Sequence, residues 1–174
     1  MDRSALISAA EDVLRQGLAL LENIDPDTYS RKADGPWESS IGAHYRHVLD
    51  HFLCLIEGLW DARINYDHRS RNPEIEGSSE VARAATLDLI DAFAAIPSDV
   101  LNQECEVVYS VGYGDKAVEG VRSVVGRELM FCVGHAIHHY AIVKLLCSLR
   151  AVALPYEFGI APSTLKYHEA QAAR

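Results

Sequence analysis

The sequence predicts an all-α protein, a four-helix bundle that forms a single domain over residues 1–174. Four long stretches carry apolar residues at the i, i+3, i+4 spacing of a helix that buries one face. Hydrophobic residues make up 49% of the 174 residues, which is enough for a sizeable core and argues against disorder. Four such helices joined by mostly short connections are typical of a bundle.

The first predicted helix covers residues 4–24 and stops before a proline, because proline cannot continue a helix. A polar loop over residues 25–38 follows. The second helix begins at a cap formed by Ser39 or Ser40 and runs to about Ala62.

The segment 64–77 reads as a charged loop. Ser78 or Ser79 then caps a third helix, whose apolar spacing continues to Ile96. Pro97 ends this helix.

Residues 103–122 change character, because β-branched and aromatic residues alternate on either side of a glycine-rich turn at 112–115. This pattern predicts a small β-hairpin or extended excursion before the fourth helix. Ser123 is expected to cap that helix, which continues to about Arg150. Pro162 opens a short terminal helix.

Charge and composition exclude several classes of function. The net charge is −9 and no basic patch is present, which argues against a nucleic-acid partner or an anionic membrane surface. The N-terminus has no signal-peptide pattern, and no apolar run reaches the length of a membrane span. The cysteines form no CxxC pair, so we expect a reducing, cytoplasmic location.

Six of the eight histidines fall in two clusters, His44, His47 and His51 in the second predicted helix and His135, His138 and His139 in the fourth. Histidine is the commonest metal ligand, and i, i+4 spacing puts two imidazoles one turn apart on one face of a helix. Two such helices side by side can close a three-histidine site with open coordination positions. That arrangement is typical of a catalytic metal centre rather than a structural one.

His135 and His139 are the favoured pair on the fourth helix. They lie about 40° apart around the helix axis and share the inward-facing stripe. His138 falls off this stripe, so we expect it to flank the site or to support a ligand from behind.

His47 is the best third ligand on the second helix. His44 and His51 are separated by about 10 Å along the helix axis, and metal–nitrogen bonds are about 2.0–2.1 Å long, so both cannot reach the same ion. Asp50 is placed to orient an imidazole from behind. The additional histidines His44, His51 and His138 leave other choices of three ligands open.

A second explanation of the histidines needs no metal. An HxxxH spacing is common by chance, and no glutamate follows His135, so the zinc-protease pattern HExxH is absent. The histidines would then form a buried polar network that rigidifies the bundle.

Four further residues are candidates for chemistry. Glu128 lies on the inward stripe of the fourth helix and could act as a catalytic general base or support a ligand, whereas the alternative is a salt bridge near the helix start. Arg69 and Arg71, with Tyr66, could bind an anionic substrate such as a thiol carboxylate. The alternative is a solvated loop in which the arginines pair with acidic neighbours.

The two histidine clusters resemble motifs of the DinB superfamily, which includes the YfiT-like metal-dependent hydrolases. The resemblance rests on residues 40–51 (SIGAHYRHVLDH) and 135–139 (HAIHH), and residues 157–164 (EFGIAPST) are similar to the end of a DinB-like subgroup. It covers nearly the whole chain in helix order. Its members are four-helix bundles that bind a divalent metal through one histidine of the second helix and an HxxxH pair of the fourth.

Matched residue by residue, the resemblance implies His47, His135 and His139 as ligands of nickel, zinc or iron. Known activities of the superfamily include maleylpyruvate isomerisation with mycothiol and thiol transfer from bacillithiol. The resemblance therefore implies a metal-dependent transferase or isomerase that uses a low-molecular-weight thiol on a small-molecule substrate. A metal-dependent hydrolase and a non-catalytic metal- or ligand-binding bundle are the alternatives.

The sequence departs from the superfamily pattern after the second HxxxH histidine. Many members continue with Arg-Gly-Gln, whereas Tyr140-Ala141-Ile142 stands here, which leaves the substrate open. A homodimer is also expected, because bundles of this type often pair through a helix face.

Overall fold

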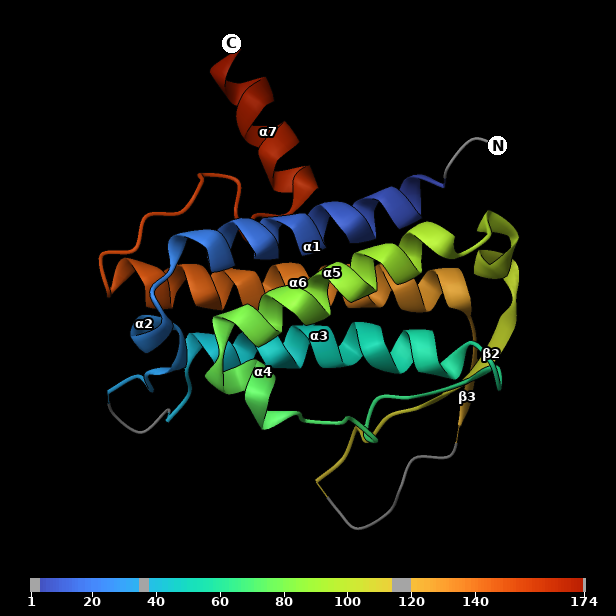
Figure 1. The fold of residues 1–174 in the computed structure, drawn as a ribbon. Helices are drawn as coiled ribbons and strands as arrows, with labels where there is room; N and C mark the ends of the chain where they lie inside the picture. Colours follow the sequence, from blue (N-terminus) through green and yellow to red (C-terminus); the bar gives the residue numbers. More distant parts are fainter. Residues whose placement is uncertain (1–3, 35–37, 114–119, 174) are drawn as a thin grey trace.

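The computed structural model describes residues 4–34, 38–113 and 120–173 (Figure 1). Its four long helices are α1 (Ala5–Asn23), α3 (Ile41–Gly58), α5 (Ser79–Ala95) and α6 (Val125–Ser148). Helix α1 packs against α5 and α6, and α3 packs against the same two helices. The predicted four-helix bundle is therefore confirmed.

Two of the long helices begin at the serines that the sequence indicates. Ser40 and Ser78 each accept a hydrogen bond from a backbone amide three residues later. The predicted cap of the fourth helix is wrong, because α6 begins at Val125 without a side-chain cap. Ser123 instead donates its hydroxyl to Glu128 at 2.6 Å.

The segments predicted as loops contain two short helices, α2 (Pro26–Ser30) and α4 (Pro73–Gly77). Each begins with a proline, preceded by the capping side chain of Asp25 or Asn72. Helices of one turn carry too few residues for a hydrophobic period, so the sequence pattern does not reveal them.

A three-stranded sheet lies at one end of the bundle (Figure 1). Strands β2 (Glu104–Val108) and β3 (Val121–Val124) pair antiparallel and confirm the predicted hairpin. Part of its predicted glycine-rich turn falls in residues 114–119, outside the described residues. The sequence did not predict β1 (Arg63–Asn65), which pairs parallel to β2, because three residues are too short to show alternation.

Two further elements complete the chain. The 3-10 helix η1 (Ser98–Asn102) connects α5 to the sheet. Helix α7 (Pro162–Ala172) projects away from the bundle and has no buried residue (Figure 1).

Helix α6 is long and apolar enough to cross a membrane, judged by length and composition alone. It packs against α1 and α3 within the bundle. One such helix is weak evidence for a membrane span, because a core helix of a soluble protein meets the same criterion.

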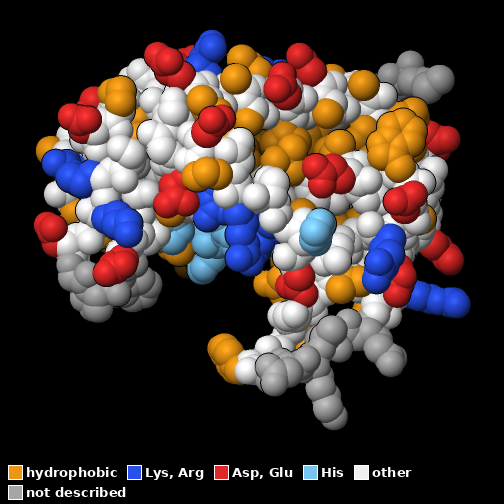
Figure 2. Space-filling view, turned by 60° about the horizontal axis from the view of Figure 1, so that its bottom comes forward, with side chains coloured by type: hydrophobic (Ala, Val, Ile, Leu, Met, Phe, Trp, Pro, Cys, Tyr) orange, Lys and Arg blue, Asp and Glu red, His pale blue; other side chains and the backbone are white. Residues whose placement is uncertain are grey.

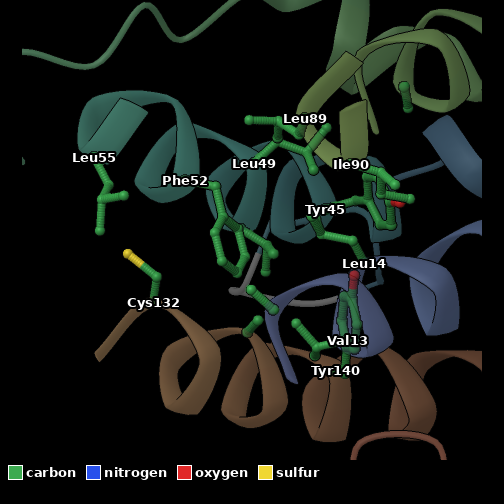
Figure 3. Packing of buried hydrophobic residues seen from close by; sticks show 14 of the residues in the cluster. Val13, Leu14, Tyr45, Leu49, Phe52, Leu55, Leu89, Ile90, Cys132 and Tyr140 are labelled. Carbon is green, nitrogen blue, oxygen red and sulfur yellow. The ribbon is translucent and has the colours of Figure 1, made fainter. Parts of the chain in front are cut away.

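The hydrophobic core lies between the four long helices and includes an aromatic layer (Figure 3). The core residues labelled in the figure are Val13, Leu14, Tyr45, Leu49, Phe52, Leu55, Leu89, Ile90, Cys132 and Tyr140. The rings of Phe52 and Phe93 meet edge to face, with centroids 5.6 Å apart. This contact joins α3 to α5, while the packing of α3 against α6 brings the two histidine-bearing helices side by side.

Gly42 marks a close approach between α3 and α4. A Cβ at this position would overlap the backbone carbonyl of Glu76 and would lie 2.8 Å from the ring of Tyr29. We expect Gly42→Ala to lower the free energy of unfolding by about 2–3 kcal/mol, because backbone must move to make room. Urea denaturation monitored by circular dichroism measures this change.

Gly134→Ala is the matched control. Beyond its chain neighbours and the backbone of its own helix, no atom of the described residues lies within 4 Å of a Cβ at this position in the middle of α6. The alanine should raise the free energy of unfolding by up to about 1 kcal/mol through helix propensity. Equal unfolding midpoints for the two variants would contradict the close approach at Gly42.

Candidate metal centre

Helices α3 and α6 bring His47, His135 and His139 together. One ring nitrogen from each residue lies within 4.8 Å of the other two, and Nε2 of His47 is 2.9 Å from Nε2 of His135. Metal–nitrogen bonds of about 2.0–2.1 Å place tetrahedral ligand nitrogens about 3.4 Å apart. The Nε2 atoms of His47 and His135 lie somewhat closer than this, and the ligand nitrogens of all three residues lie within 4.8 Å of one another. The three histidines are therefore positioned to bind a metal ion.

The environment of these histidines keeps their rings neutral. Burial, reinforced by neighbouring imidazoles, lowers the pKa of His47 to about 2, of His135 to about 3 and of His139 to about 4. A metal ligand must be a neutral imidazole with a free lone pair. Near neutral pH the three rings are already in that state.

His44 and His51 lie at the two ends of the triad. Nδ1 of His44 is 3.0 Å from Nδ1 of His139. Nδ1 of His51 donates to the backbone carbonyl of His47 at 2.8 Å, so its lone pair is on Nε2. That Nε2 atom is buried and has no hydrogen-bond partner among the described residues.

The unpaired nitrogen of His51 fits a site that holds a further group. A buried polar atom without a partner costs free energy, and the His51 ring lies 4.1 Å, centroid to centroid, from the ring of His135. His138 is exposed and meets His139 only edge-on, at a centroid distance of 5.6 Å. It therefore lies at the outer margin of the cluster.

Asp50 is buried, and its carboxylate accepts a hydrogen bond from the loop that follows β1. Its Oδ2 accepts a hydrogen bond from Arg46 at 3.0 Å, and its Oδ1 accepts one from Ser70 at 3.3 Å. It makes no hydrogen bond to an imidazole in the described part of the chain, although the sequence placed it as a support for one. Its contact with Ser70 ties the loop after β1 to helix α3.

Glu128 and Tyr66 form a buried pair behind His51. Tyr66 donates its hydroxyl to one carboxylate oxygen of Glu128 at 3.1 Å, and Ser123 donates to the other. The Tyr66 ring stacks on His51 with centroids 5.4 Å apart. The hydroxyl of Tyr66 is thus already used within the protein.

The two candidate arginines differ in position. Arg69 is half-buried, and one of its guanidinium nitrogens lies 3.3 Å from Nδ1 of His47. Arg71 is exposed. Neither forms an ion pair with a carboxylate within the described ranges, so the acidic pairing considered from sequence does not occur there. In Figure 2, histidine and basic side chains meet at a recess of the surface.

Comparisons with known proteins address the fold. No protein-family model matches the sequence. A segment of 108 residues is 32% identical to "FK506-binding protein 5" of Rhizopus delemar and covers 62% of this chain. The match spans only 28% of the length of that curated relative.

A solved structure of a DinB-like protein, YjoA of Bacillus subtilis, matches with a TM-score of 0.67. The match covers 89% of this chain and 99% of the other. This chain has a DinB-like fold. The sequence identity is 15%, so the likeness establishes the DinB-like fold and leaves the activity to be argued from the site.

Sequence reasoning missed an aromatic wall beside the triad of the DinB-like bundle. The Phe131 ring stacks on His135 with centroids 5.6 Å apart, and the Tyr109 ring meets Phe131 edge to face. A surface pocket of about 340 Å³ is lined by Phe131, His135 and neighbouring residues of α6. The i, i+4 spacing of Phe131 and His135 was the available signal, whereas the approach of Tyr109 depends on the hairpin.

Proposed function

We propose that this protein is a divalent-metal-dependent enzyme that acts on a small molecule. The observation that carries the proposal is the geometry of His47, His135 and His139, whose ring nitrogens lie within 4.8 Å of one another. No carboxylate or thiol in the described residues completes this group, so a metal held by it keeps open positions for water or substrate. The DinB-like fold supports the same proposal by resemblance.

The metal, when bound, supplies a Lewis acid that activates water or binds a substrate thiolate. We favour a transferase or isomerase that uses a low-molecular-weight thiol, on the resemblance to the superfamily, with hydrolysis as the second candidate. Nickel, zinc and iron are the candidate metals, and nitrogen ligands suit all three.

The surrounding residues hold the ligands in place. His44 hydrogen-bonds His139, and the backbone carbonyl of His47 orients His51. Glu128 accepts hydrogen bonds at both of its oxygens, so in this proposal it positions Tyr66 against His51 rather than exchanging protons with a substrate. The rings of Phe131 and Tyr66 pack against each other on one side of the site, with centroids 5.3 Å apart.

Two metal-dependent rates test the proposal. Protein loaded with zinc, nickel or iron(II) is assayed for conjugation of cysteamine to 1-chloro-2,4-dinitrobenzene, and separately for hydrolysis of 4-nitrophenyl acetate. We expect a metal-dependent rate in the first assay that disappears in a His135→Ala/His139→Ala variant. A rate in the second assay alone would favour the hydrolase. Stoichiometric metal without either rate would favour the non-catalytic metal-binding bundle.

Four features stay predictions from sequence: a small-molecule substrate, a cytoplasmic location, a homodimer, and the lack of nucleic-acid or membrane partners. Sedimentation velocity at two protein concentrations tests the homodimer directly.

A further inference from the structure

We propose that Arg69 is the anion-binding residue of the metal centre and receives a carboxylate of the substrate beside His47. The inference rests on the proposed function and narrows its substrate to small molecules that carry a carboxylate. Arg71 and Tyr66, which the sequence groups with Arg69, have no part in this binding.

Arg69 is a cation that no carboxylate of the described residues pairs with. Its guanidinium contacts Nδ1 of His47 at 3.3 Å, and its Nε is buried with no hydrogen-bond partner among the described residues. No carboxylate in that part of the chain forms an ion pair with it. Burying an unpaired donor on a charged group is costly, so this arrangement fits an anion that supplies the missing acceptor.

The loop that carries Arg69 is anchored on both sides. The amide of Tyr66 donates to the carbonyl of Val108 in β2 at 3.0 Å. On the other side Ser70 donates to the buried carboxylate of Asp50 on α3. The guanidinium is therefore held near the triad before any ligand arrives, which reduces the entropy lost on binding.

The hydrogen bond between Arg69 and His47 depends on the tautomer of the imidazole. A guanidinium can only donate, so Nδ1 of His47 accepts and its proton is on Nε2. If His47 were to hold a metal through Nε2, its proton would lie on Nδ1 instead. The N–H groups of His47 and Arg69 then face each other as two donors, and a carboxylate oxygen can accept from both.

The positive charge of the site also favours a carboxylate ligand. The guanidinium of Arg69 lies 3.3 Å from Nδ1 of His47, so its positive charge stands at the edge of the metal centre. A divalent metal in the same recess increases the positive charge. A carboxylate would offset the charges of both Arg69 and the metal. Its two coplanar oxygens match the paired N–H donors of the arginine guanidinium.

The other two candidates are placed differently. Arg71 is exposed and makes no ring contact or hydrogen bond to the histidines. Tyr66 is buried, and its hydroxyl is donated to Glu128. Anion binding beside the metal therefore depends on Arg69.

The test compares two thiols by isothermal titration calorimetry on zinc-loaded protein. Mercaptoacetate carries a carboxylate, whereas 2-mercaptoethanol carries a neutral hydroxyl, and the thiol of either can bind the metal. The preference for mercaptoacetate is measured in the wild type, Arg69→Gln and Arg71→Gln. The two variants remove the same charge from the same loop.

We expect Arg69→Gln to reduce the preference by about tenfold or more, since a hydrogen bond to a charged group contributes about 1.5–3 kcal/mol. Arg71→Gln should keep the wild-type preference. Zinc content measured on every variant shows that the site is intact. If Arg69→Gln does not fold, Arg69→Lys takes its place and should lower the preference through loss of the planar donor.

An unchanged preference in Arg69→Gln overturns the inference and leaves the proposed function standing. If neither thiol binds the zinc-loaded wild type, thiol chemistry fails, and acetate then replaces the thiols as the probe. Weaker acetate binding to Arg69→Gln than to Arg71→Gln would still support Arg69, and equal binding would overturn it.

Discussion

Replacing both His135 and His139 by alanine should abolish stoichiometric metal binding. The wild-type protein, reconstituted with zinc or nickel and dialysed, should hold about one equivalent of metal per chain, as expected for one compact three-histidine group. The double variant keeps only His47 of that group, and a single imidazole does not retain the ion through dialysis. Plasma mass spectrometry on untagged protein measures the metal content.

His138→Ala is the matched control, because it removes an exposed histidine of the same cluster and should keep the metal. Metal retained by the double variant would show that other side chains hold it, such as His47 with either His44 or His51. Absence of metal from the reconstituted wild type would support the buried polar network. A separate His47→Ala variant should lose the metal while the metal-free protein stays folded, since an open catalytic site is not needed for the fold.

Acidification from pH 7 to pH 5 destabilises the metal-free protein. The pKa values of His47, His135 and His139 are lowered to about 2, 3 and 4 in the fold, whereas unfolded histidines titrate near 6.5. Between these values the unfolded chain binds protons that the folded chain does not. Stability therefore rises with pH through this window, and falls as the solution is acidified.

Each of the three histidines contributes at most about 2 kcal/mol to the loss at pH 5, because one pKa unit corresponds to about 1.4 kcal/mol. Burial also lowers the pKa of His44 and His51, which act in the same direction. Urea denaturation of the metal-free protein at pH 7, 6 and 5 measures the change. The His135→Ala/His139→Ala variant should depend less on pH, and equal stability of the wild type at pH 7 and pH 5 would contradict the lowered values.

Bound metal should make the stability of the folded protein depend more steeply on pH. Protons compete with the ion for the imidazole lone pairs, so the stabilisation by bound metal is lost as pH falls. The difference in melting temperature between loaded and metal-free protein should therefore shrink from pH 7 to pH 5.

Local sequence patterns determined the long helices of this protein and the helix faces that carry its histidines. The apolar period indicated the four long helices, and the cap residues Ser40 and Ser78 indicated two of their starts. The i, i+4 spacing of His135 and His139 likewise put both on one face of α6. These features depend on residues that are close together in the chain, so one sequence suffices to predict them.

Tertiary structure alone decided how these elements meet. Several contacts join segments that are distant in sequence. They are the contact of Arg69 with His47, the pairing of β1 with β2 and the hydrogen bond from Tyr66 to Glu128. Short strands and loops carry no hydrophobic period of their own, and their positions follow from packing against α3 and α6. The sequence by itself determined the bundle and its histidine faces, whereas only the packed fold decided which charged and aromatic side chains surround them.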